Sequence, residues 1–320
     1  MNIFLTFDIE VWCNGWDALD ERFPAAFDRY VYGRSRAGEY ALPKTLEIMQ
    51  RHGVKGVFFV EPLFAARFGV EHLAKIVSLI QDGGQEVQLH LHPEWTDEIR
   101  PVVFPDKPYK RQHLTYYSFE EQTELLQRGL QLLRDAGAKE VTAFRAGSFA
   151  ANGDTLAAVK ACGLRTDASL NMCYPISGAD VRPEGDFYFP RLRDGLQLLP
   201  MSVFRDGLGR LRHAQVGACG TREFIEAIEA SQERKHPCFT ILSHNFEMLR
   251  AGTVERDRIV AGRFEALCRF LGQNAKHLPT QGMAGQIRLD MPSIPTDLVS
   301  VGKWATAERY VGQLLRRLGI

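Results

Sequence analysis

The sequence predicts an α/β fold in which parallel strands alternate with helices. Short segments rich in apolar, β-branched and aromatic residues, such as residues 3–10 and 54–60, have the pattern of buried strands. Between them lie helical patterns, such as residues 40–52 and 71–81, which are followed by the glycines Gly53 and Gly83. Polar residues recur where the apolar strands stop. This strand–helix–strand order requires helical crossovers and favours a parallel sheet.

The same reasoning assigns the remaining elements in chain order. Further strands are predicted at residues 86–92, 141–144, 164–167, 196–203 and 238–242. Further helices are predicted at residues 118–135, 152–162, 221–232, 255–272 and 301–318, the first opened by a capping box of Ser118 and Glu121. Residues 11–39 and 94–117 are expected to be long irregular segments, and residues 279–295 a linker.

Composition excludes several classes of protein. The chain has 320 residues, 45% of them hydrophobic and 24% charged, which suits one large α/β domain or two smaller ones. Lys+Arg and Asp+Glu both number 39, so no excess of positive charge favours nucleic acid. No apolar run approaches the ~20 residues of a membrane span, and residues 1–7 lack the features of a secretory signal. Six cysteines without C-x-x-C spacing indicate reduced thiols, so a cytoplasmic protein is expected.

Two histidines lie on one face of the strand predicted at residues 86–92. His90 and His92 are two residues apart, so both imidazoles project from the same side, as a chelating pair requires. Pro93 ends the strand, which places the pair at a strand end, where sites in α/β folds are built. The alternative is a strand that happens to carry two polar histidines.

Further polar residues occupy other strand ends. Asp8 and Glu10 share one face at the end of the first strand, and the later strands end in Arg145, Asp167 and His244. In an α/β barrel these ends open on one face, so the side chains are expected to converge. A carboxylate with two histidines is typical of catalytic zinc, and a second carboxylate and a separate histidine can act as general base and acid. Each residue taken singly also has an ordinary structural interpretation.

The chain resembles the polysaccharide deacetylases with a NodB-homology domain, which form carbohydrate esterase family 4. Its motifs occur in the same order along the chain as the motifs of that family. The resemblance covers about residues 1–275 and rests on five segments: Thr6-Phe7-Asp8-Ile9-Glu10, His90-Leu91-His92-Pro93, Phe144-Arg145-Ala146-Gly147-Ser148-Phe149, Asp167-Ala168-Ser169 and Leu242-Ser243-His244. They stand where the family has its T-F-D-D, H-x-x-x-H-P, arginine, D-x-S and L-x-H motifs. The resemblance implies a distorted α/β barrel of about seven or eight strands.

The resemblance also implies roles for these residues. Asp8 would be the base, His244 the acid, and Glu10, His90 and His92 the ligands of a divalent metal, most simply Zn²⁺. Arg145 would tune Asp8, and Asp167 would support His244. Residues expected to bind substrate are Trp12, Trp95, Phe149 and Asn245, although the aromatic ones could instead belong to the core.

Two departures from the family pattern matter. The metal carboxylate is Glu10, one residue beyond the second aspartate of the usual motif, a D-x-E form that resembles a variant branch of the family. The second histidine follows the first by two residues instead of four, and counting four from His90 gives Glu94 as an alternative ligand. Both departures keep open a degenerate, inactive relative.

These observations predict a metal-dependent hydrolase that removes N- or O-acetyl groups from a sugar, with a lipid-linked or nucleotide-linked precursor of a surface polysaccharide as the expected substrate. The rivals are an amidohydrolase of the same fold acting on a non-sugar amide, and a non-catalytic carbohydrate-binding relative. No nucleic acid partner and no integral membrane segment are expected. A homo-oligomer is left open.

The chain is expected to divide into a deacetylase-like domain, residues 1–275, and a C-terminal linker and helix, residues 276–320. The apolar residues of that helix are Trp304, Val311, Leu314 and Leu318, and its basic residues are Arg309, Arg316 and Arg317. Such a helix is expected to pack on the barrel or to make a dimer contact. Contact with a membrane surface is the alternative.

Overall fold

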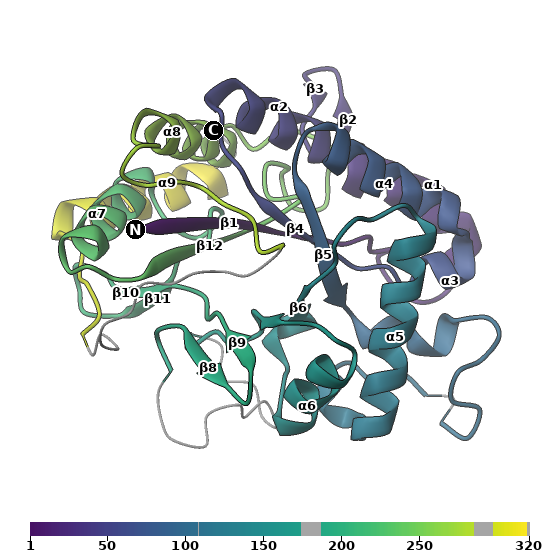
Figure 1. Cartoon of the computed structure of the whole chain (residues 1–320). Helices are drawn as coiled ribbons and strands as arrows, with labels where there is room; N and C mark the ends of the chain where they lie inside the picture. Colours follow the sequence, from purple (N-terminus) through teal and green to yellow (C-terminus); the bar gives the residue numbers. More distant parts are fainter. Residues whose placement is uncertain (108, 174–186, 285–296, 319–320) are drawn as a thin grey trace. The chain divides into compact units, whose positions relative to one another are not determined.

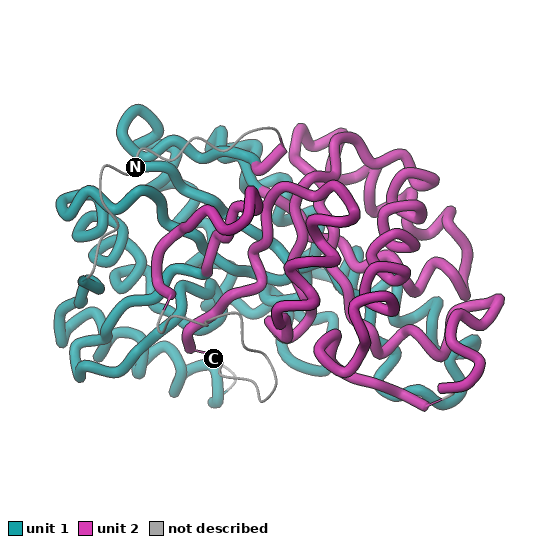
Figure 2. Tube along the Cα trace, turned by 60° about the horizontal axis from the view of Figure 1, so that its bottom comes forward, with its two compact units in different colours: residues 1–56, 201–282, 289–320 teal, residues 57–200, 283–288 magenta. Residues whose placement is uncertain are grey.

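The computed structural model describes residues 1–107, 109–173, 187–284 and 297–318. Its contacts divide the chain into two compact units, coloured separately in Figure 2. Unit 1 comprises Met1–Gly56, Met201–Gly282 and Leu289–Ile320, and unit 2 comprises Val57–Pro200 and Met283–Arg288. The boundary predicted near residue 275 stays a prediction.

Unit 1 is built on two buried parallel strands, β1 (Asn2–Ile9) and β12 (Cys238–His244). Their register pairs Asn2 with Cys238 at one end and Asp8 with His244 at the other. The helices of the unit are α1 (Leu19–Phe27), α2 (Leu42–His52), α7 (Thr221–Glu233), α8 (Arg258–Gln273) and α9 (Lys303–Arg317). Two small antiparallel pairs complete it, β2 (Arg34–Ser35) with β3 (Gly38–Glu39) and β10 (Val203–Arg205) with β11 (Leu211–His213).

Local sequence explains where the main helices of unit 1 begin and end. The helix α2 ends at Gly53, which has φ 65° and is the left-handed position that favours glycine. The helix α8 begins after Asp257, whose carboxylate accepts the backbone N–H groups of Ile259 and Val260 at 3.1 and 3.0 Å. Both helices turn apolar residues inward, and both pack against each other (Figure 1).

Unit 2 holds a mostly parallel arrangement of strands. The parallel strands are β4 (Val57–Val60), β5 (Glu86–Leu91), β6 (Ala143–Ala146), β7 (Thr166–Asp167) and β9 (Leu196–Leu198), with β8 (Arg191–Arg193) antiparallel beside β9. The crossovers contain α3 (Ala65–Phe68), α4 (Val70–Asp82), α5 (Phe119–Asp135) and α6 (Gly153–Ala161). Short 3₁₀ turns cover Pro93–Glu98, Leu114–Tyr116 and Gly147–Phe149.

Within unit 1 β12 lies beside β1, and within unit 2 the strands follow the order β4-β5-β6-β7-β9-β8; among the described pairings of these strands only β8 with β9 is antiparallel. The predicted α/β pattern is therefore matched by the helices and by six strands: β1, β4, β5, β6, β7 and β12. The capping box of Ser118 and Glu121 is present at the start of α5. In the described residues, none of the helices has the combination of length and hydrophobicity that a bilayer span requires.

Several expectations about individual elements were wrong. Residues 11–39 are not irregular, because they contain α1, a π-helical turn over Asp28–Tyr32 and the β2–β3 pair. The helix α1 starts at Ala18 without a side-chain cap and contains Pro24, so it lacks the usual start signal. Residues 196–203 form two strands instead of one, since Pro200 separates β9 from β10. The helix α7 is capped at Gly220, whose N–H donates to Glu223, and not at Thr221.

The apolar side of the C-terminal helix α9 does not pack on the rest of the chain, the first of the arrangements expected for it, while the dimer contact and the membrane surface stay predictions. Its apolar residues Trp304, Val311, Leu314 and Leu318 are exposed. Its buried residues are Ala305, Thr306 and Arg309, and Arg309 forms ion pairs at 2.9 Å with Asp206 and with Glu223. The helix is therefore held to its unit by polar contacts, and its apolar side faces outward.

Candidate active site

Asp8, Glu10 and His244 lie together at the carboxyl ends of β1 and β12. The parallel register makes Asp8 the direct neighbour of His244, and Glu10 follows one residue after the end of β1. One carboxylate oxygen from each acid and one ring nitrogen of His244 all lie within 4.8 Å of one another. Both carboxylates are buried, so unit 1 concentrates two acids and a histidine in a small, largely water-excluded volume.

His244 has a carboxylate partner that the sequence analysis did not consider. Its Nδ1 lies 3.0 Å from Oε1 of Glu247, while Oε2 of Glu247 accepts the Gly217 N–H at 2.6 Å and the Ser243 hydroxyl at 3.3 Å. Burial by itself would lower the pKa of His244. The hydrogen bond to Glu247 and the nearby charges of Glu10, Glu247 and Asp8 outweigh burial and raise the pKa to about 9. These contacts favour the protonated form of His244, which is the form that can donate a proton.

Glu10 is fixed by two neighbours predicted to bind substrate. Trp12 donates its indole Nε1–H to Oε2 of Glu10 at 2.6 Å. Asn245 accepts the Glu10 N–H at 3.1 Å and donates to the Glu10 carbonyl at 3.0 Å. The buried amide of Asn245 is engaged by the backbone, so what the structure shows for Asn245 is a positioning contact with Glu10.

In unit 2, the hydrogen bonds of His90 and His92 fix which ring nitrogen carries the lone pair. Nδ1 of His90 lies 2.8 Å from the carbonyl oxygen of Arg145, the register partner of His90 on β6. Nδ1 of His92 lies 3.2 Å from Oε2 of Glu94. A carbonyl or carboxylate oxygen accepts, so both Nδ1 atoms are donors, and in the neutral imidazole the lone pair is then on Nε2. This is the tautomer in which metal-binding histidines are usually held.

Gly147 allows the main chain to pass close to His92. A Cβ atom at Gly147 would lie 2.7 Å from the carbonyl oxygen of Leu91 and 2.8 Å from the His92 ring, closer than real Cβ contacts. The next two residues, Ser148 and Phe149, have φ values of 54° and 55°, which residues other than glycine rarely adopt. Backbone strain of this kind concentrates at functional sites, and here it follows the strand end that carries Arg145.

Arg145 and Asp167 occupy adjacent strands of unit 2. The guanidinium Nε of Arg145 donates to the Ala168 carbonyl at 3.2 Å and its Cζ lies 4.3 Å from the Phe59 ring centroid. Asp167 accepts the Ser169 N–H at 3.0 Å and the Ser169 hydroxyl at 2.8 Å. Burial raises the pKa of Asp167 to about 6, against the lowering effects of Ser169 and Arg145. The predicted pairing of Arg145 with Asp8 and of Asp167 with His244 stays a prediction.

Two more residues of unit 2 complete the description. Trp95 is 1% exposed and packs edge-on against Phe64 and Phe68, which favours its alternative assignment as a core residue.

Glu61 is a buried acid of unit 2 that sequence reasoning missed. It directly follows β4, is fully buried and accepts the Leu63 N–H at 2.8 Å. Burial raises the pKa of Glu61 to about 8, so it is largely protonated at neutral pH. Its position just after an apolar strand was the signal that could have found it.

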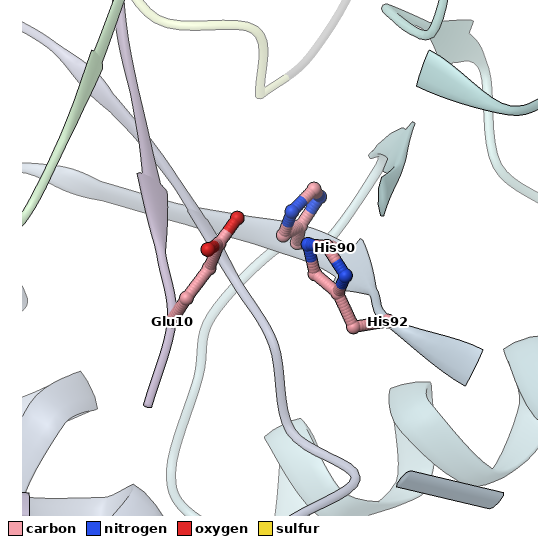
Figure 3. Close-up of side chains that lie close together, drawn as sticks. All are labelled: Glu10, His90 and His92. Atoms are coloured by element: carbon pink, nitrogen blue, oxygen red, sulfur yellow. The ribbon is translucent and has the colours of Figure 1, made fainter. Parts of the chain in front are cut away.

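The predicted metal ligands form a compatible set of donors. Figure 3 draws these three residues: Glu10 follows β1 in unit 1, and His90 and His92 lie at the end of β5 in unit 2. One carboxylate with two imidazoles is a common protein ligand set for a catalytic divalent metal, and it leaves coordination positions for water or substrate. The donor chemistry of these residues therefore fits a metal of this type.

Comparison with known proteins supports the same family. Residues 25–166 match the family model for polysaccharide deacetylases. A protein from Mycobacterium smegmatis, provisionally named a polysaccharide deacetylase, aligns over 100% of this chain and 91% of its own, with 17% identity and a TM-score of 0.55. This similarity shows a shared fold and confirms the predicted fold class. No curated protein sequence matches the chain.

Two other solved structures are similar at a lower level. A family 4 carbohydrate esterase from Streptomyces lividans, in complex with acetate, aligns over 88% of this chain and 92% of its own, with 12% identity and a TM-score of 0.44. A carbohydrate esterase family 4 pseudoenzyme from Bacillus anthracis aligns over 85% of this chain and 60% of its own, with 15% identity and a TM-score of 0.41. The matched family model supports a polysaccharide deacetylase domain over residues 25–166 of this chain.

Proposed function

We propose that the protein is a metal-dependent deacetylase that removes N- or O-acetyl groups from a sugar. The observation that carries the proposal is the juxtaposition of Asp8 with His244 on paired strands, next to the carboxylate of Glu10. A buried acceptor beside a partly buried donor is an arrangement that suits general acid–base hydrolysis. Glu10, His90 and His92 would hold the metal, which we propose to be Zn²⁺.

When bound, such a metal supplies Lewis-acid chemistry, which polarises the acetyl carbonyl and makes a water more acidic. The residues of the chain supply the proton transfers. Asp8 accepts a proton from the water as its oxygen bonds to the carbonyl carbon. His244 donates its proton to the departing nitrogen or oxygen of the sugar as the bond from that atom to the carbonyl carbon breaks. The products are acetate and the free amino or hydroxyl sugar.

Supporting residues keep these groups in the required protonation states. Glu247 holds His244 protonated, and the Trp12 indole fixes the Glu10 carboxylate. Glu94 and the Arg145 carbonyl orient the two histidines. We propose that Arg145 tunes Asp8 and that Asp167 supports the acid His244, as the family resemblance implies.

The proposed substrate is an acetylated precursor of a surface polysaccharide, processed in the cytoplasm. Six free cysteines support a reducing compartment. Trp12 and Phe149 are partly exposed and are proposed to contact the sugar rings. A homo-oligomer is left to experiment. A catalytically inactive sugar-binding relative and a hydrolase of a non-sugar amide are the rivals.

Replacing Asp8 by Asn tests the proposed function. The metal-loaded wild type should release acetate from an oligomer of N-acetylglucosamine or from an O-acetylated sugar. Asp8→Asn should lower kcat by about 10²–10⁴-fold, because the amide cannot accept the proton, while the metal content stays that of the wild type. Acetate release is followed enzymatically and metal by mass spectrometry. Release from a non-sugar amide alone, or an Asp8→Asn enzyme with normal activity, would contradict the proposal.

A further inference from the structure

The outward side of α9 is an apolar stripe. At 3.6 residues per turn, Trp304, Ala307, Val311, Leu314, Leu315 and Leu318 project within about 100° of the helix circumference. Trp304 is 80% exposed, Leu318 64%, and Val311 and Leu314 57% each. Large apolar side chains are exposed singly on most proteins, but a row of them along one helix marks an interaction surface.

The contacts on the opposite side of α9 keep the apolar stripe exposed. The opposite side of α9 is held by Arg309, which is buried and paired with Asp206 and Glu223, and by Thr306, whose hydroxyl donates to Glu223 at 3.2 Å and accepts the Gly207 N–H at 2.8 Å. These directional contacts fix the rotation of the helix about its axis. The apolar stripe cannot turn inward without breaking two buried ion pairs.

Positive charge borders the stripe on one side. Lys303 and Arg317 are exposed on α9 at the edge of the stripe, and Arg210 donates to the hydroxyl of Tyr310 at 3.3 Å on the same side. Leu208, which is 58% exposed, lies in the turn between β10 and β11 that contacts α9 through Gly207. The exposed acid on α9 is Glu308, so the border carries a net positive charge.

We propose that the α9 stripe docks on the surface of an anionic lipid bilayer. An amphipathic helix that presents tryptophan and leucine outward, with lysine and arginine at its border, lies in the interface with its apolar side among the acyl chains and its cations at the headgroups. The charge asymmetry favours lipid over an antiparallel pairing with a second copy of the chain, because that symmetric pairing would bring the like-charged borders of two stripes together. The docking does not depend on the deacetylase activity.

Flotation with vesicles tests the proposal. The full chain is mixed with vesicles of phosphatidylcholine and phosphatidylglycerol in about equal amounts, and with vesicles of phosphatidylcholine alone. The wild type should float with the mixed vesicles, with a blue shift in Trp304 emission that Trp304→Phe removes. Val311→Ser with Leu314→Ser should lower the partition coefficient on the order of tenfold. Lys303→Glu with Arg317→Glu should lower it by about fivefold or more for each charge.

Leu192→Ser is the matched control, because Leu192 is 75% exposed on β8, outside the stripe, and its replacement should leave flotation unchanged. A wild type that ignores both kinds of vesicle, or stripe variants that float as well as the wild type, would overturn the proposal. A concentration-dependent dimer that the Val311→Ser, Leu314→Ser variant abolishes, without vesicle binding by the wild type, would assign the stripe to a second copy. Acetate release in solution is measured in parallel, so failure of docking and failure of the proposed function are separable.

Discussion

At the scale of single residues, the hydrogen bonds of His90, His92 and His244 assign different tasks to chemically identical side chains. His90 and His92 donate from Nδ1 to oxygen acceptors, which leaves a lone pair on Nε2 and suits a ligand. His244 faces the carboxylate of Glu247 among further acids, which favours the protonated form and suits an acid. The hydrogen-bond partners of each imidazole, and not the residue type, therefore decide whether a histidine suits a metal ligand or a proton donor.

The ligand assignment can be tested on His92 and Glu94. His92→Ala should abolish tight binding of Zn²⁺, because a ligand is lost. Glu94→Gln should lower the affinity by only about 10–100-fold, because the amide orients His92 less well than the carboxylate does. Zinc titration with a competing chelator measures both. Full zinc content in His92→Ala together with its loss in Glu94→Gln would show that Glu94 is the ligand, the alternative that the four-residue spacing left open.

Glu247 should set the alkaline limb of the pH–rate profile. The active acid is protonated His244, and Glu247 raises its pKa, so activity should fall as the pH rises through that pKa. Glu247→Gln removes the stabilising charge and should therefore move the alkaline limb of kcat to lower pH, with less effect near the acidic end. Glu255→Gln, at an exposed acid of the same segment, is the control.

A comparison with Asp167→Asn separates the two carboxylates proposed to support the acid. The predicted outcome is that Glu247→Gln moves the alkaline limb and Asp167→Asn moves it less, because Glu247 is in direct contact with His244. If Asp167→Asn moves the limb and Glu247→Gln does not, the support comes from Asp167, as the resemblance to the family alone predicts.

At the scale of elements, α9 illustrates how a helix can be predicted correctly and oriented wrongly. Its periodicity predicted a helix with an apolar and a basic side, and the structure contains both. The apolar side was expected to pack on the barrel or to make a dimer contact. The buried side instead carries Arg309, because Asp206 and Glu223 lie behind it at 2.9 Å, and these partners belong to distant parts of the chain. Such pairings are invisible to the local pattern.

Breaking the Arg309 ion pairs should destabilise unit 1. Arg309→Met retains much of the side-chain volume but leaves Asp206 and Glu223 buried without their cation, which costs about 3–5 kcal/mol in comparable cases. Urea unfolding followed by circular dichroism should show a lower midpoint. Arg317→Met, at an exposed arginine of the same helix, should change the midpoint little. Equal stability of the two variants would mean that the ion pairs contribute no net stabilisation.

The other differences between expectation and structure have local causes. The helix α1 contains a proline and lacks a cap, so neither its length nor its start could be predicted from pattern. The β8–β9 hairpin turns at Asp194 and Gly195, both with positive φ, a turn signal that was available in the Asp-Gly dipeptide. Glu247 was missed because it lies in a loop after β12, where no periodicity identifies the partner of His244.

At the scale of the whole molecule, parallel pairing brings distant segments of the sequence together. Asp8 and His244 come from near opposite ends of the chain, yet they are register partners on β1 and β12. The sequence predicted this much because each residue ends an apolar strand, and parallel strands present their carboxyl ends on one edge. It could not predict the tautomers, the strained backbone at Ser148 and Phe149, or the pKa of His244, since these depend on three-dimensional neighbours.

The most direct test of the central claim is the rate of acetate release by one wild-type sample in three states: as purified without chelator, after removal of metal, and after return of Zn²⁺. Acetylated amino-sugar oligomers serve as the substrate. We predict activity in the first state, at least a hundredfold loss in the second, and recovery in the third with about one zinc per chain. Activity that survives removal of metal, or no release of acetate by fully zinc-loaded protein, would contradict a metal-dependent deacetylase.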